Sequence, residues 1–273
     1  MKNLLLWISH HPVLHLALLS FVYIFGVFAH NQLSQPFFWL AEVTSLQALN
    51  HIMQVVALVI VSVTIYLTYR RWQNHSFQAL AMSYGARTLG LFLMAYFVLM
   101  PYKSEFMHFP QYALIALLLV TLVRNFFSTL CLGALLGFMD EGYQFIGLHK
   151  LYFDFNDVIL NIIGTACGLM IALVFWPVSK TEEIKSRWSI WSWYILLLTV
   201  LLLFITGTVH FFVDEGPWHW HRNIASAFGF DFWVISTGLP PWHLVTPYEG
   251  VLWLALLPLF YWPLHRYQIH LES

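Results

Sequence analysis

Acid, amide and histidine side chains recur at helical spacing between residues 101 and 168 of an otherwise apolar sequence. Glu141 and Gln144 lie three residues apart, and Asp157 and Asn161 lie four apart, so each pair shares one face of a helix. His108 opens the preceding apolar segment. A histidine between two carboxylates can carry a proton from one to the other. If the chain is an enzyme, we therefore expect Glu141 and Asp157 to act as acid and base and His108 as proton carrier.

Glycines share the helix faces of both polar pairs. Gly137 and Gly133 precede Glu141 at steps of four, and Gly164 and Gly168 follow Asn161. Small residues allow membrane helices to approach closely. We expect these two helices to pack through their glycines and to place their polar ends at the same membrane surface.

The other polar side chains of this region are predicted to bind a ligand. They are Lys103, Glu105, Tyr112, Gln144, Lys150, Asp154 and Asn161. A carboxylate buried beside lipid is costly unless it is paired, so Lys103 or Lys150 is expected to neutralise one acid, and Lys103 to contact an anion. A lipid phosphate or a lipid-linked wall precursor would fit such a pocket. The alternative is that the polar side chains only hydrogen-bond the helices to one another.

Composition places the chain in a membrane. Of its 273 residues 60% are hydrophobic and 9% charged, and the mean hydropathy is +0.70. We predict an all-α, polytopic bundle of about eight spans, with Cys131 and Cys167 as packing residues inside apolar segments. The expected spans are 8–29, 52–69, 87–101, 111–124, 126–140, 157–178, 189–212 and 249–265.

The distribution of positive charge predicts the orientation. With a cytoplasmic N-terminus and an uncleaved first span, only Lys103, Lys150 and Arg222 face outward, which leaves nine of the twelve Lys and Arg residues inside. Both termini are then cytoplasmic and most acids lie at the outer surface of a bacterial inner membrane. The hydrophilic linker 179–188 is taken to end a core, 87–178, flanked by a two-span extension, 1–86, and a two-span tail, 179–273.

Two histidine groups are weaker candidates for metal. The first comprises His210, just before the long aromatic outer loop 213–248, and Asp214, His219 and His221 within it. Its spacing matches no standard metal motif, and an interfacial loop is the favoured interpretation. His11 and His15 form a pair four residues apart that could ligate haem or metal, although helix-end histidines that face water or a neighbouring helix are commoner. No cofactor is predicted, but these histidine groups would allow a divalent metal ion to bind.

The chain resembles the VanZ-like family of membrane proteins over about residues 87–178. The matching positions are Lys103, His108, Phe109 and Tyr112; then Glu141 and Gln144; then Asp157, Asn161 and Gly164. It departs from the family pattern where Tyr102 precedes Lys103 in place of an acid and where Lys150 stands in place of an arginine. The resemblance implies a role in the cell envelope, because the name-giving member is associated with low-level teicoplanin resistance.

Two functions follow as hypotheses. In the first, an outward polar pocket binds or processes an envelope lipid or a lipid-linked precursor. In the second, the chain is an accessory subunit that docks onto a larger membrane complex through 1–86 and the loop 213–248. The expected partners are membrane lipids and other integral membrane subunits. Nothing in the sequence is basic enough for nucleic acid.

Overall fold

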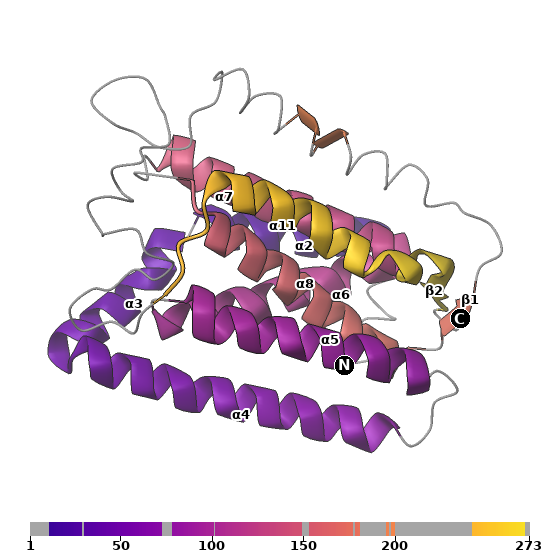
Figure 1. The fold of residues 1–273 in the computed structure, drawn as a ribbon, viewed down its shortest axis with the longest axis horizontal. Coiled ribbons are helices and arrows are strands. Elements are labelled where there is room, and N and C mark those ends of the chain that lie inside the picture. Colours follow the sequence, from indigo (N-terminus) through magenta and orange to yellow (C-terminus); the bar gives the residue numbers. More distant parts are fainter. Residues whose placement is uncertain are drawn as a thin grey trace.

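The computed structural model is a mostly helical bundle (Figure 1). It describes residues 11–28, 30–72, 78–100, 102–148, 153–176, 178–180, 195–196, 198–199 and 242–270. Lys150, the metal candidates His210, Asp214, His219 and His221, and almost all of the predicted span 189–212 lie outside the described residues.

The helices occupy most of the described chain. They are α2 (Pro12–Phe28), α3 (His30–Val43), α4 (Leu46–Trp72), α5 (Gln78–Met94) with the π-helix η1 (Ala95–Leu99), the 3-10 helix η2 (Lys103–Met107), α6 (His108–Val123), α7 (Phe126–Gly147), α8 (Phe155–Phe175), α11 (Pro247–Phe260) and the 3-10 helix η3 (Trp262–Arg266). The described residues also include two short strands, β1 (Val178–Lys180) and β2 (Tyr267–Ile269).

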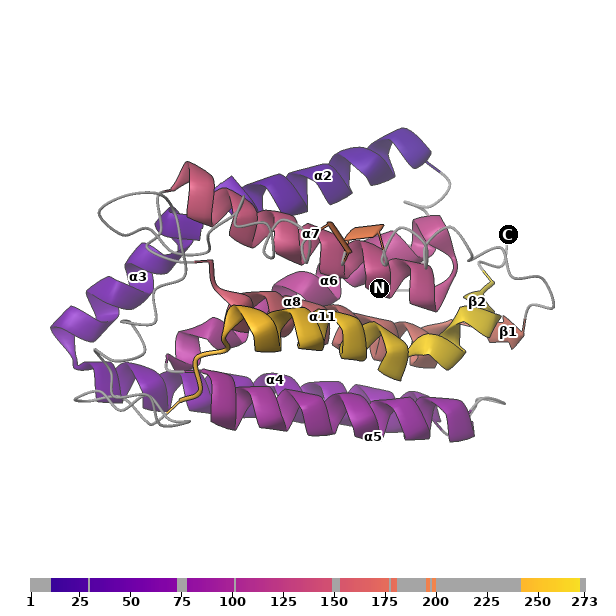
Figure 2. The ribbon, with the colours of Figure 1, turned by 45° about the horizontal axis from the view of Figure 1, so that its top comes forward.

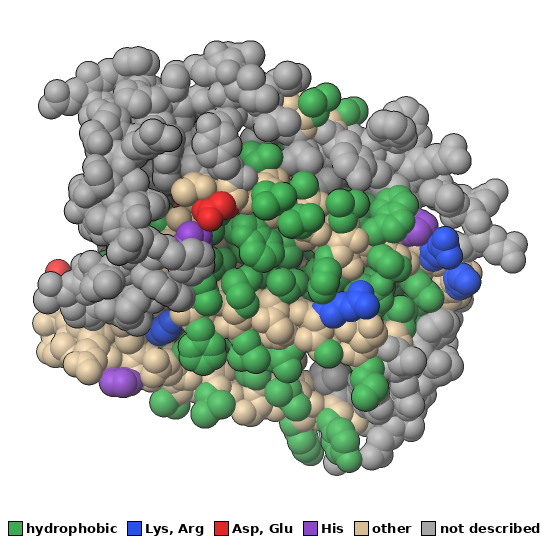
Figure 3. All heavy atoms as spheres, in the orientation of Figure 1, with side chains coloured by type: hydrophobic (Ala, Val, Ile, Leu, Met, Phe, Trp, Pro, Cys, Tyr) green, Lys and Arg blue, Asp and Glu red, His purple; other side chains and the backbone are tan. Residues whose placement is uncertain are grey.

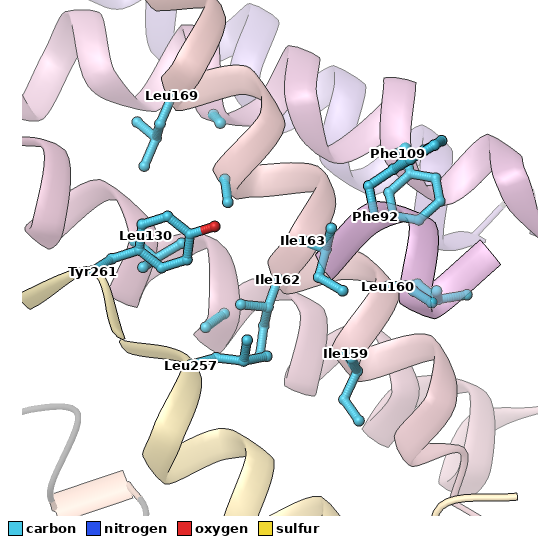
Figure 4. Close-up of a cluster of buried hydrophobic side chains, with 14 of the residues drawn as sticks. Phe92, Phe109, Leu130, Ile159, Leu160, Ile162, Ile163, Leu169, Leu257 and Tyr261 are labelled. Carbon is cyan, nitrogen blue, oxygen red and sulfur yellow. The ribbon is translucent and has the colours of Figure 1, made fainter. Parts of the chain in front are cut away.

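Helix α8 forms the centre of the bundle. It packs against α4, α5, α6, α7 and α11, and Figures 1 and 2 show it surrounded by them. Its sequence is apolar on nearly all sides, as a helix buried in a bundle requires. Figure 4 shows Ile162 and Ile163 of α8 among side chains from neighbouring helices, including Phe109, Leu130 and Leu257.

Glycines set the close contacts of α8, but in a different arrangement from the expected one. Gly137 of α7 faces α8, where an added Cβ would lie 2.8 Å from the Asn161 Cβ. Gly164 and Gly168 face α6 instead, and a Cβ on Gly168 would lie 2.8 Å from the Ala113 Cα and nearer still to its carbonyl oxygen. The expectation that both glycine pairs join α7 to α8 is therefore wrong, because the Gly164 face of α8 receives α6.

Within the described residues, four helices are long and apolar enough to cross a membrane: Leu46–Tyr66, Leu80–Leu99, Lys103–Val123 and Phe155–Phe175. They correspond to the predicted spans 52–69, 87–101, 111–124 and 157–178. Helix α5 begins at Gln78, which accounts for the apparent shortness of the span predicted at 87–101. Helix α7 continues to Gly147, so its acids are part of the helix and not of a following loop. Figure 3 shows a face whose described side chains are mostly hydrophobic, as lipid contact requires.

Two elements were not expected from the sequence. Helix α3 joins α2 to α4 obliquely across one end of the bundle (Figures 1 and 2). Strands β1 and β2 pair antiparallel, with Val178 opposite Ile269, so the fold is not purely α-helical. Strands of three residues carry too little alternation to be recognised from sequence.

The described part of the C-terminal segment packs into the core. Gly250 of α11 lies against the ring of Phe155, and the Tyr261 hydroxyl is 2.7 Å from the Thr88 hydroxyl of α5. Contacts of this kind make α11 part of the same bundle as the predicted core 87–178.

Candidate functional site

Polar side chains of α6, α7 and α8 meet at one end of the bundle. Helices α6 and α8 begin there and α7 ends there, because α7 runs antiparallel to both (Figure 1). His108 opens α6, and its Nδ1 lies 2.8 Å from Asn161 Oδ1 on α8. Its Nε2 lies 3.4 Å from Asp157 Oδ1, one turn earlier on α8. The proximity of these three residues was expected from the sequence.

The hydrogen on His108 can be assigned from this geometry. An amide oxygen only accepts hydrogen bonds, so Nδ1 carries a hydrogen and donates it to Asn161. Nε2 is then the nitrogen that faces the Asp157 carboxyl group.

A second group of buried residues lies along α7 and is centred on Asp140. The Tyr112 hydroxyl donates to Asp140 Oδ2 at 3.0 Å. The Gln144 amide donates to Asp140 Oδ1 at 3.0 Å and to Glu141 Oε1 at 2.8 Å. Asp140 is 1% exposed, and Tyr112, Glu141 and Gln144 are fully buried. One amide therefore holds two neighbouring carboxyl groups inside the protein.

Asp140 was missed among the candidate site residues. It lies four residues before Gln144, which is the spacing that brings side chains together on a helix. The sequence contains this spacing, but Asp140 was overlooked because Glu141 already supplied a partner for the Gln144 amide.

Two buried amide atoms of these groups lack a hydrogen-bond partner among the described residues. They are Gln144 Oε1, an acceptor, and Asn161 Nδ2, a donor. Both side chains are fully buried. Buried polar atoms are nearly always hydrogen-bonded in folded proteins, so the two unpartnered atoms mark a place where a further group can bind.

Lys150, one of the two lysines expected to neutralise an acid, lies outside the described residues, and Lys103 is held by main-chain carbonyls. The Lys103 ammonium donates to the carbonyl oxygens of Tyr96 at 2.7 Å and Met100 at 3.2 Å, and lies 4.6 Å from the centre of the Tyr96 ring. These carbonyls end the helix formed by α5 and η1, and a helix C-terminus attracts positive charge. The carboxyl group of Glu105, on the same short helix η2, interacts electrostatically with this ammonium.

Asp154 begins α8. Its carboxylate accepts a hydrogen bond from the Asn156 backbone N–H at 2.9 Å, which is the usual contact of a helix N-cap. In the structure Asp154 therefore has a capping role, and a contact with a ligand remains a prediction.

Asn156 is a second residue that sequence reasoning missed. Its Nδ2 donates to the carbonyls of Leu99 and His243, and its Oδ1 accepts from the Val245 backbone N–H, all within 2.9 Å. It holds the chain before α11 against the polar end of the bundle. Nothing in the local sequence indicates this role, because all three partners are distant backbone groups.

A histidine–acid pair lies in that C-terminal segment. His243 Nε2 is 3.3 Å from Glu249 Oε2, and the Glu249 carboxylate also accepts from the Thr246 backbone N–H and hydroxyl. The Thr246 hydroxyl in turn accepts from the Glu249 N–H, which completes a capping box at the start of α11. This pair therefore fixes the N-terminus of α11.

The described residues give no support to a metal site. Within them, no three His, Cys, Asp or Glu side chains come together in a way that could hold a metal ion. His15 is buried, and its Nε2 lies 2.8 Å from the Leu118 carbonyl oxygen and 3.1 Å from the Thr121 hydroxyl of α6. His15 thus attaches α2 to α6 in the described structure.

Comparisons of the chain with protein-family models, with curated proteins and with solved structures found no match.

Proposed function

We propose that the chain is a multi-pass protein of a bacterial inner membrane, with about eight spans, both termini cytoplasmic and the polar end of the bundle outward. The four long apolar helices and the excess of Lys and Arg on one predicted side support this topology. The starts of α6 and α8 and the end of α7 then lie at the outer surface.

At that surface, the polar cluster binds the headgroup of an envelope lipid or a lipid-linked precursor. The observation that carries this proposal is the pair of buried amides, Gln144 and Asn161, each with one polar atom unpartnered among the described residues. A purely structural cluster would satisfy both ends of each amide, since an unpartnered buried polar group costs about 1–3 kcal/mol. The resemblance to VanZ-like proteins over 87–178 favours the same class of ligand.

If the protein also transforms the bound headgroup, the residues of the cluster have different roles in that reaction. His108 and Asp157 are in direct contact and exchange a proton at Nε2. Glu141 lies on α7 with Asp140 and Gln144, so it acts on the opposite side of the ligand. Lys103 orients the end of α5 instead of contacting the anion.

The second candidate is an accessory subunit of a larger membrane complex. Helix α4 favours the accessory-subunit function, because only 22% of its most apolar stretch, within Leu46–Tyr66, is buried in the bundle. Its exposed apolar side chains, which include Val55, Leu58 and Ile65, suit a partner helix as well as lipid.

Native mass spectrometry of the full chain, released from nanodiscs, tests both candidates. The first predicts a monomer or small homo-oligomer that retains lipid and loses it on Glu141→Gln or Asp157→Asn. The second predicts stoichiometric membrane subunits that stay bound in those variants and dissociate when 213–240 is deleted. The deletion must stop before 242 because the contacts of His243 and Val245 with Asn156 hold α11 in place.

A further inference from the structure

The polar cluster has a donor side and an acceptor side. Among the described residues, Asn161 Nδ2 is an unpartnered hydrogen-bond donor, and Gln144 Oε1 is an unpartnered acceptor beside the carboxyl groups of Asp140 and Glu141. Asn161 Nδ2 would lie 3.4 Å from a Cβ placed on Gly137, one helical turn before those acids. Gly137 lies two helical turns before Gln144, about 10 Å along α7, and the Gln144 amide reaches back one turn to Asp140, so the two atoms lie along one face of α7.

The acceptor side disfavours an anion. The Gln144 amide nitrogen lies within 3.0 Å of an oxygen of Asp140 and of an oxygen of Glu141. Carboxylate groups so close to the Gln144 amide repel an anion that approaches it. Gln144 Oε1 can only accept, so it requires a group that carries hydrogen. An ammonium group meets both conditions because it is positive and donates three hydrogen bonds.

The donor side requires the opposite. Asn161 Nδ2 can only donate, and it lies next to the His108 imidazole. An ester or phosphate oxygen is a suitable acceptor there. A ligand that satisfies both sides carries a primary amine a short distance from a phosphodiester.

We propose that the cluster selects a zwitterionic aminophospholipid headgroup, with its primary ammonium toward Gln144 Oε1 and its phosphodiester toward Asn161 Nδ2. This inference rests on the proposed function and names the class of lipid. The headgroup enters at the edge formed by His108 and Asp157, whose side chains are each 10% exposed, whereas Glu141, Gln144 and Asn161 are fully buried. A trimethylammonium has no N–H to donate to Gln144 Oε1.

The test measures lipid retained by the full chain in native mass spectra after exchange into nanodiscs. Four lipids with identical acyl chains are compared: phosphatidylethanolamine, its N,N-dimethyl derivative, phosphatidylcholine and phosphatidylglycerol. We expect retention to fall with each loss of N–H, by about tenfold from the primary to the quaternary amine, which corresponds to one charge-assisted hydrogen bond. Gln144→Met should remove this discrimination between amines, whereas Gly90→Ala, where a Cβ meets nothing within 4 Å, should keep it.

The outcomes separate the two proposals. If no headgroup is retained above the detergent background, the proposed lipid-binding function fails. If phosphatidylglycerol or phosphatidylcholine is retained as well as phosphatidylethanolamine, the function stands and the amine selectivity is overturned. A preference for the primary amine that persists in both Gln144→Met and Asn161→Leu also overturns the inference, because the lipid then binds elsewhere. The comparison among lipids on the unsubstituted chain decides the selectivity even if a variant fails to fold.

Discussion

The side-chain amides at the two ends of the bundle have different hydrogen-bond partners. At the end away from the cluster, Asn125 donates to the carbonyls of His265 and Tyr267 and accepts from the Ser128 backbone N–H, so each of its polar atoms is bonded to main chain. At the polar end, Asn161 and Gln144 bond to other side chains, and each keeps one atom unpartnered among the described residues. The Asn125 amide thus holds main-chain segments together, whereas the proposed ligand site uses amides that bond to side chains.

Asn156 shows that this difference does not depend on location. It lies only five residues before Asn161 on the same helix, yet all three of its hydrogen bonds go to backbone groups. The pair therefore offers a comparison within one helix between a structural amide and a candidate site amide. The predictions below test that comparison, from the largest expected change in stability to the smallest.

Gly168→Leu should cause the largest loss, about 3 kcal/mol in the free energy of unfolding, because the new side chain meets the Ala113 backbone, which cannot move aside. The matched control is Gly90→Leu, where a Cβ meets nothing within 4 Å and the change should be near zero. Unfolding by denaturant in detergent micelles, followed by circular dichroism, measures both. Equal stability of the two variants would contradict the close packing of α6 on α8.

Asn156→Ala should lower the unfolding free energy by about 2 kcal/mol, because it leaves the Leu99 and His243 carbonyls and the Val245 N–H without their partner. Asn161→Ala should cost about half as much, since only the bond to His108 is lost. Lipid retention should show the opposite order, with the stronger effect in Asn161→Ala. The comparison fails if both variants lose stability and lipid in the same proportion.

Tyr23→Phe should cost about 1 kcal/mol, because the Tyr23 hydroxyl donates to the Leu136 carbonyl at 3.0 Å and so joins α2 to α7. Thermal unfolding in the same micelles measures the loss. Lipid retention should not change, since Tyr23 makes no hydrogen bond to the amides of the cluster in the described structure. A loss of retention in this variant would extend the site to α2.

Glu141→Gln should change stability by less than about 0.5 kcal/mol, because the new amide keeps the shape of the side chain and its oxygen still accepts from Gln144. Lipid retention should nevertheless fall, since one negative charge next to the expected ammonium is removed. The same two measurements, made on one preparation, show whether the effects separate. A loss of several kcal/mol would instead identify the cluster as a structural connection between helices.

Much of the polar end could be predicted from spacing along single helices. The pairs Glu141 with Gln144 and Asp157 with Asn161, and the position of His108 at a helix start, follow from helical periodicity and are observed in the structure. Spacing did not predict the partner of Lys103, because the carbonyl groups that hold it are exposed by a helix end that appears only when α5 extends through η1. Spacing also did not predict the hydrogen bonds of Asn156, because its partners are backbone groups of distant residues.

Composition and helical periodicity are local properties, and they sufficed to predict a chain that is helical, apolar enough for a membrane and polar at particular helix ends. Other features arise only when distant segments pack together: which face of α8 receives α6 and which receives α7, which carbonyl groups hold Lys103, and which amide is satisfied by distant main chain. These features depend on contacts between residues far apart in sequence, and the hydrogen-bonding needs of a buried group can be assessed only when all its neighbours are in place.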